Sequence, residues 1–220
     1  MSWSAWILFF GLTLYADLVP YLPARFGGRG ETIAPGMLDD PKMIAWSIVG
    51  AWISLLLVVG LAWRARLTRR DMGLVSLPTG RLLRWAGLVF AGLAVTGIAP
   101  SLVFGDKLGV IEAITRPPEG ASGWMLWFLL AASAGVAEEV IMRGYGIGFL
   151  LRAGVSRWGA AVGMALYFGL LHIYQGPAAV PVIAIWGFLF AWSYLATGSL
   201  YPGMIAHTLV DAIAPLFIGR

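Results

Sequence analysis

Long apolar runs make up most of the chain, and short polar segments separate them. A helix needs about 20 mostly apolar residues to cross a lipid bilayer. Seven stretches approach that length, at roughly 3–22, 43–63, 83–104, 121–142, 158–175, 178–198 and 201–219. The pattern predicts an all-α fold, a polytopic transmembrane bundle of 7–8 helices in a single integral membrane domain over residues 1–220.

The eighth helix of the higher count would come from residues 144–157, which are too short to span a bilayer. Simple depth counting places Glu138 past the midplane and His172 near the far end of the next run. At 1.5 Å per residue, the two differ in depth by roughly 10–15 Å. We therefore expect residues 144–157, which contain four glycines, to dip back into the membrane and bring the two levels together.

Arginine is concentrated in one of the polar segments. Residues 64–84 contain six arginines against one acidic residue, Asp71, whereas segments 23–42 and 105–120 mix both signs. Positively charged residues favour cytoplasmic loops. We therefore predict that residues 64–84 and the N-terminus lie in the cytoplasm. The first run has no basic segment before it and no clear cleavage site, so it is interpreted as a retained helix in a bacterial inner membrane.

The composition supports a membrane protein and removes several classes of site. Hydrophobic residues are 60% of the chain and charged residues 12%, against roughly 25% in soluble proteins. The net charge of +4 does not indicate nucleic-acid binding, because the arginines lie in short loops between apolar runs. The absence of cysteine excludes disulfides, thiolate nucleophiles and cysteine metal ligands.

Ionisable side chains inside the apolar second half are the candidates for function. Such groups are costly at membrane depth, usually face the interior of the bundle and mark functional sites. The chain has only two histidines, and both belong to this set. The six candidates are Glu138, Glu139, Arg143, His172, His207 and Asp211.

Helical spacing divides these candidates into groups. Glu139 and Arg143 are four residues apart, so their side chains meet on one face and neutralise each other. Glu138 is turned about 100° from that pair, which leaves it as the candidate general base. His207 and Asp211 are also four residues apart and can point at one spot.

Simpler explanations exist for the individual residues. A single intramembrane histidine often has only a packing role, and two adjacent glutamates near a helix end can be a solvated pair. Phe168 lies one turn before His172 and can support its ring. The joint occurrence of these residues in a half that is otherwise almost free of charge favours one common site.

Three short motifs occur in order on three of the apolar runs: "EEVIMR" fits E-E-x-x-x-R, "FGLLH" fits F-x-x-x-H and "HTLVD" fits H-x-x-x-[ND]. In this the chain resembles the CPBP family of intramembrane endopeptidases, which includes type II CAAX prenyl proteases and the bacteriocin-processing (Abi) proteins. The resemblance covers about residues 121–215, which would form the catalytic part, with the active site in a membrane cavity.

The resemblance implies a role for each matching residue. Glu138 and His172 would activate water, His207 with residue 211 would stabilise the oxyanion, and Glu139 with Arg143 would be a supporting pair. Many members have Asn where this chain has Asp211. An amide can donate a hydrogen bond to an oxyanion, whereas an ionised carboxylate only accepts. We therefore expect Asp211 to orient and charge His207.

The implied activity is hydrolysis of a peptide bond near the C-terminus of a membrane-associated or prenylated peptide. The partners would be a peptide or lipidated protein and the lipid bilayer, without nucleic acid; the oligomeric state stays open. A metal-free reaction is favoured over a zinc-dependent one with Glu138, His172 and His207 as ligands. Two further classes of protein fit buried ionisable groups of this kind, a proton-coupled transporter and a non-catalytic immunity or scaffold protein.

Overall fold

The computed structural model describes residues 41–104, 119–175 and 177–216, and this part of the chain contains helices and no strand. The all-α prediction is therefore confirmed for the described residues. Helix α3 is Pro41–Arg64, α4 is Thr79–Phe104 and α5 is Gly120–Glu138. The π-helix η3 (Glu139–Ile147) and helix α6 (Gly148–Arg152) follow α5 without a break.

The second half of the bundle is built from three further helices. These are α7 (Arg157–Leu171), α8 (Ala179–Thr197) and α9 (Tyr201–Ile213), with short 3-10 turns at His172–Gln175 and Ala214–Leu216. Five of the predicted runs begin or end within a few residues of α3, α4, α7, α8 and α9. The predicted first run, residues 3–22, lies outside the described residues.

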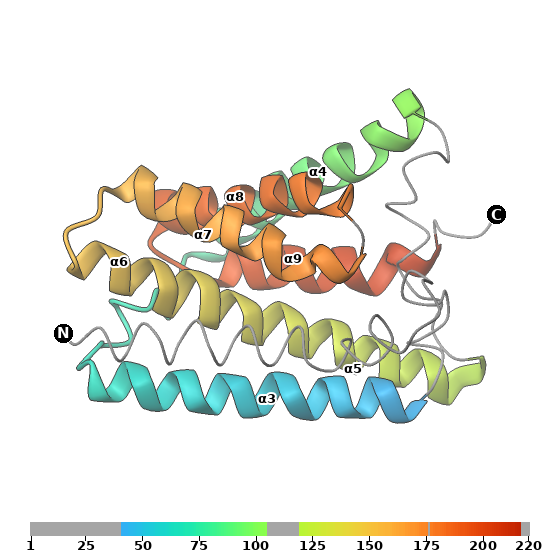
Figure 1. Ribbon diagram of the computed structural model, residues 1–220, viewed down its shortest axis with the longest axis horizontal. Coiled ribbons are helices and arrows are strands. Elements are labelled where there is room, and N and C mark those ends of the chain that lie inside the picture. Colours follow the sequence, from blue (N-terminus) through green and yellow to red (C-terminus); the bar gives the residue numbers. More distant parts are fainter. Residues whose placement is uncertain (1–40, 105–118, 176, 217–220) are drawn as a thin grey trace.

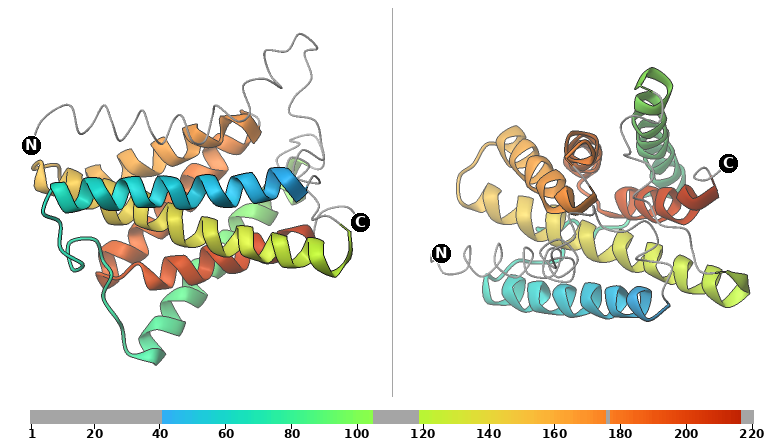
Figure 2. Two further views of the ribbon diagram at one scale, coloured as in Figure 1. Left: turned by 90° about the horizontal axis from the view of Figure 1, so that it is seen from below. Right: turned by 45° about the vertical axis from the view of Figure 1, so that its right-hand side comes forward.

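The helices are arranged as a bundle around the continuous α5–η3–α6 rod (Figure 1). Helix α3 lies along one side of this rod and packs against α5. On the other side, α7 packs along α8, while α9 contacts both α4 and α5. Helix α4 crosses the bundle obliquely (Figure 2). The rod thus lies between α3 and the helices that carry the histidines.

The prediction that residues 144–157 form a re-entrant segment is wrong. Residues 144–152 continue the helix that starts at Gly120, which gives an unbroken helix of 33 residues, Gly120–Arg152. The residues of η3 are buried, and η3 packs against α7, α3 and α8. Gly144 and Gly148 also lie against the backbone of Met72 and Asp71, so the helix does not need to end where the apolar run ends. Only residues 153–156 form the connection to α7.

The segment between α3 and α4 is anchored on the end of this long helix. The Asp71 carboxylate accepts hydrogen bonds from the backbone N–H and hydroxyl of Thr68 (2.7 and 2.8 Å) and from the Arg152 guanidinium (2.7 Å). These contacts with Thr68, and to a smaller extent with Arg152, lower the pKa of Asp71 below its ordinary value. The backbone N–H of Leu200 donates to the Gly73 carbonyl at 2.8 Å, so the same segment holds the start of α9.

Within the described residues, three helical stretches have the length and composition needed to cross a membrane: Pro41–Arg64, Gly120–Arg152 and Ala179–Thr197. Large apolar side chains of α3 face outward, among them Trp46 (70% exposed) and Trp63 (80% exposed). An outer surface of this kind suits a lipid environment. The full count of 7–8 helices, the orientation and the cavity stay predictions.

The orientation can be tested with single cysteines, because the chain has none of its own. Ser76 and Ser122 are both exposed. Ser76 lies in the segment anchored to the Arg152 end of the long helix, and Ser122 lies in the first turn at its other end, about 45 Å away. We expect Ser76→Cys to be labelled only from the cytoplasmic side and Ser122→Cys only from outside. Labelling of Ser76→Cys from outside would reverse the orientation.

Candidate functional site

The six ionisable candidates lie on four different elements of the chain, α5, η3, the 3-10 turn after α7, and α9. Glu138 is the last residue of α5, and Glu139 and Arg143 are on η3. His172 is the first residue after α7, and His207 and Asp211 are on α9. The long helix positions three of the six, and the α7 and α9 helices bring the other three towards them.

Glu138 and His172 lie at nearly equal distances along their helices from the short connection that joins these helices, residues 153–156. Glu138 is 14 residues before Arg152, and His172 is 15 residues after Arg157. At 1.5 Å per residue, both are about 20 Å from that connection. The expected difference in depth arose because the helix was assumed to end near residue 142, whereas it continues to Arg152.

Helix α9 reaches the same level because it begins inside the bundle. A Cβ atom placed on Gly144 would be 3.1 Å from the Leu200 side chain, so the first residues of α9 lie beside Gly144. Glu138 is six residues from Gly144, and His207 is seven residues from Leu200. Since the two helices run in opposite directions, these nearly equal intervals bring Glu138 and His207 together.

Two glycines allow α5–η3 and α9 to approach closely. A Cβ atom on Gly203 would be 3.0 Å from Glu139 Oε2, and one on Gly135 would be 2.9 Å from the backbone nitrogen of Thr208. Any larger residue would push the helices apart at the site. The small residues therefore set the distance at which His207 meets the glutamates.

Glu139 and Arg143 form the buried ion pair that their spacing predicts. Arg143 Nη1 donates to Glu139 Oε1 at 2.9 Å, and both side chains are 1% exposed. Arg143 Nη2 donates to the carbonyl oxygen of Gly187 on α8 at 3.0 Å. The pair therefore joins the long helix to α8. Both residues lie on the π-helical segment, a conformation that is often found at functional sites.

His207 is surrounded by three carboxylates. Its Nδ1 is 3.1 Å from Glu139 Oε1, an oxygen that accepts, so Nδ1–H donates to Glu139. Its Nε2 is 3.7 Å from Glu138 Oε2 and 3.5 Å from Asp211 Oδ2. The structure thus brings His207 and Asp211 together, as the spacing predicts. It adds a contact that the sequence did not indicate, between His207 and Glu139.

His172 has a defined tautomer when it is neutral. Its Nδ1 is 2.8 Å from the carbonyl oxygen of Phe168, which can only accept, so Nδ1 carries the proton. The Nε2 atom is then left with a lone pair. The His172 ring also contacts the Phe168 ring, with centroids 4.7 Å apart, as expected for a residue one helical turn before it.

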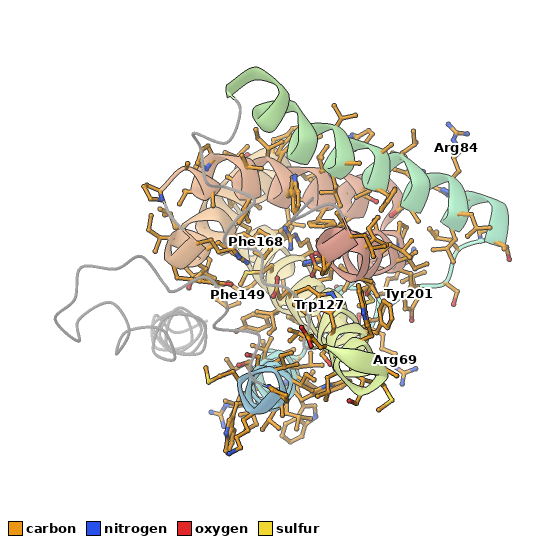
Figure 3. The ribbon with its side chains drawn as sticks, turned by 90° about the vertical axis from the view of Figure 1, so that its right-hand side faces the viewer. Arg69, Arg84, Trp127, Phe149, Phe168 and Tyr201 are labelled. Atoms are coloured by element: carbon orange, nitrogen blue, oxygen red, sulfur yellow. The ribbon has the colours of Figure 1, made fainter. Side chains whose placement is uncertain are left out.

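Aromatic rings and one guanidinium connect the two histidines. The Arg143 guanidinium carbon lies 4.5 Å from the centroid of the Phe168 ring and 4.9 Å from that of the Phe190 ring. Phe190 in turn stacks on His207, with centroids 4.7 Å apart and an angle of 22° between the planes. Figure 3 shows Phe168 inside the bundle, whereas Arg69 and Arg84 project outward.

The sequence did not single out Phe190 or Gly187. Both lie in α8, whose residues are apolar on every side, so neither polar spacing nor an amphipathic pattern distinguishes one face. The sequence offered one signal for Phe190, its aromatic side chain within the apolar run between the second and third motifs. It offered none for Gly187.

Among the described residues, no group of three or more His, Cys, Asp or Glu side chains is arranged to hold a metal ion. The set considered for zinc was Glu138, His172 and His207. The centroid of the Phe168 ring is 4.7 Å from that of the His172 ring and 6.2 Å from that of the His207 ring. The metal-free reaction stays a prediction.

The two adjacent glutamates should differ in their effect on stability. Glu139→Ala would leave Arg143 buried with no carboxylate, so we expect the free energy of unfolding to fall by about 3–5 kcal/mol. Glu138→Gln should change it little, because the Glu138 side chain is 29% exposed and outside the Arg143 pair. Thermal unfolding in detergent measures both, with the exposed Glu119→Ala as a control. Early melting of Glu138→Gln beside a normal Glu139→Ala would reverse the assignment.

Comparison with known proteins gives one match, to a family model. No curated protein and no solved structure is similar enough to match the chain. A family model described as type II CAAX prenyl endopeptidase Rce1-like matches residues 120–213, the part that runs from α5 to the end of α9. That match contains all three motifs and agrees with the resemblance that they indicated: residues 120–213 of this chain are similar to the Rce1-like type II CAAX prenyl endopeptidase family.

Proposed function

We propose that the chain is an intramembrane CAAX-type endopeptidase. It hydrolyses a peptide bond near the C-terminus of a membrane-associated or prenylated peptide, in a bacterial inner membrane with residues 64–84 on the cytoplasmic side. The family match supports the activity and the class of substrate. The three long apolar helices support the location in a membrane.

One observation carries the assignment of the base. Glu138 and Glu139 are neighbours in the chain, yet the side chain of Glu138 is 29% exposed and that of Glu139 is 1% exposed. Water can therefore reach part of the Glu138 side chain, whose Oε2 is buried beside His207. Glu139 is enclosed between Arg143 and His207. A general base must come within hydrogen-bonding distance of the water that it activates. The difference in exposure supports the proposal that Glu138 is the reacting carboxylate.

The proposed reaction needs three groups of this chain. Glu138 removes a proton from a water molecule, with the Nε2 lone pair of His172 as a second acceptor. The water oxygen then attacks the carbonyl carbon of the scissile peptide bond. The carbonyl oxygen becomes an oxyanion, and a proton on Nε2 of His207 donates a hydrogen bond to it. Glu138 returns the proton to the leaving nitrogen as the C–N bond breaks and the oxyanion re-forms the C=O bond, which yields a carboxylic acid and an amine. The acid then releases its proton to Nε2 of His172 or to water.

Asp211 acts on His207 in this scheme. Its Oδ2 is 3.5 Å from Nε2 of His207, so it can accept a hydrogen bond from a proton on that nitrogen before substrate binds. When the oxyanion forms near Nε2 of His207, it replaces the Asp211 carboxylate as the acceptor of this hydrogen bond. A residue that can only accept suits this task, since it keeps the proton on Nε2 without competing as a donor.

Replacement of Glu138 tests the proposed function. We expect Glu138→Gln to lower kcat by about 10²–10⁴-fold, because the amide cannot accept a proton from water. The assay compares a farnesylated peptide with a C-terminal CAAX sequence and the same peptide without the lipid, using purified protein in detergent. Glu119→Gln, the same chemical change at the other end of α5, is the matched control and should retain full activity. Hydrolysis by Glu138→Gln at the wild-type rate would rule out this role.

The hydrolysis is proposed to need no tightly bound metal. If Glu138 is the base, only two of the three residues considered as zinc ligands remain, His172 and His207, and the chain has no cysteine that could be a third ligand. We expect purified active protein to contain far less than one zinc per chain, and to keep its activity after treatment with a chelator. Zinc near one equivalent, with loss of activity on chelation and recovery on zinc addition, would instead make Glu138, His172 and His207 ligands.

A further inference from the structure

The imidazole of His207 is held by contacts of two kinds. Its Nδ1–H donates to Glu139 Oε1 at 3.1 Å, which fixes one atom of the ring. Phe190 covers a face of the ring at 4.7 Å between centroids and 22° between planes. One hydrogen bond leaves the ring free to tilt about the axis through that atom. The stacked face removes this freedom.

We propose that Phe190 is a positioning residue for the hydrolysis, which fixes the plane of the His207 ring and so the direction of Nε2. This inference rests on the proposed function, in which Nε2 of His207 donates to the oxyanion. The torsion that orients an imidazole is broad, so hydrogen bonds and packing must select its value. In this chain the direction of Nε2 depends on Phe190 as well as on Glu139.

Phe190 is itself held firmly enough for this task. Phe190 is 1% exposed, and the guanidinium carbon of Arg143 lies over its ring, 4.9 Å from the centroid. A cation over an aromatic face is attracted to it, the more so where water is excluded. Arg143 is fixed in turn by Glu139 and by the Gly187 carbonyl. Apolar residues of α4 and α9 complete the surroundings of Phe190: Val89, Leu93, Ala206 and Val210.

Phe168 has a different position relative to His207. Its ring meets that of His207 at 89° and 6.2 Å between centroids, an edge-to-face contact, whereas it lies 4.7 Å from His172. Each histidine therefore has one close phenylalanine neighbour, and Arg143 lies against both phenylalanines. Replacement of Phe190 should accordingly affect His207 and leave His172 in place.

The ring position can be tested without measuring activity. The chain has two histidines, so protein labelled with carbon-13 at histidine Cε1 gives two resonances, assigned with His172→Gln. Phe190→Leu removes the aromatic face, and we expect the His207 resonance to shift because its ring-current contribution is lost. The His172 resonance should stay where it is. Phe149→Leu is the matched control, since Phe149 is also a buried ring (2% exposed) but contacts Tyr145 instead.

The same variants give the kinetic arm of the experiment. We expect Phe190→Leu to lower kcat by about 10–100-fold with KM within about twofold, as for a small misplacement of a reacting group. Phe190→Tyr, which keeps the aromatic face, should restore most of kcat, and Phe149→Leu should keep the wild-type kcat. If Phe190→Leu does not fold, Phe190→Met makes the same comparison with a more flexible side chain.

Three results would overturn the inference: an unmoved His207 resonance in Phe190→Leu, an unchanged kcat in that variant, or an equal loss of kcat in Phe149→Leu. Absence of hydrolysis by the wild type is a different outcome. It would overturn the proposed function and with it a role of Phe190 in hydrolysis, while the resonance still decides whether Phe190 fixes the His207 ring.

Discussion

The burial of one guanidinium organises the centre of this bundle. Arg143 is 1% exposed, in the interior of a helix bundle whose buried side chains are mostly hydrophobic. A charge in such a place is strongly destabilising unless it is paired and its hydrogen bonds are satisfied. Arg143 meets this requirement with Glu139, the Gly187 carbonyl and the faces of Phe168 and Phe190. These partners come from three separate elements, η3, α7 and α8, so satisfying the charge also fixes how the helices pack.

The same ion pair gives two neighbouring glutamates different tasks. Glu139 Oε1 is shared between Arg143 at 2.9 Å and His207 at 3.1 Å, which joins α9 to the other three elements. Glu138 points elsewhere, because adjacent helical residues are turned by about 100° from each other. Its side chain is 29% exposed and that of Asp211 is 31% exposed, whereas that of His207 is only 7% exposed. The accessible carboxylates thus lie at the border of a buried, structurally fixed cluster.

Local spacing predicted the parts of this site that lie on one helix. The pairs Glu139–Arg143 and His207–Asp211 follow from the helical period, and the structure has both. The contact between Glu139 and His207 joins residues 68 positions apart, and no helical period indicates it. The six arginines of residues 64–84 predicted a polar loop there, but not that Asp71 and Gly73 would anchor it to α6, α8 and α9.

Depth was the quantity that the sequence predicted least well, and the reason is physical. Hydropathy locates the end of an apolar run, whereas a helix ends where its backbone loses its partners. The run containing Glu138 becomes polar near Arg143, but that arginine is neutralised inside the bundle, and the helix continues to Arg152. The ion pair that allows Arg143 to be buried is therefore also the reason that the length of the apolar run predicted the wrong depth for Glu138. Once the helix is counted to its true end, Glu138 and His172 are at nearly equal distances from the 153–156 connection, and no re-entrant segment is needed.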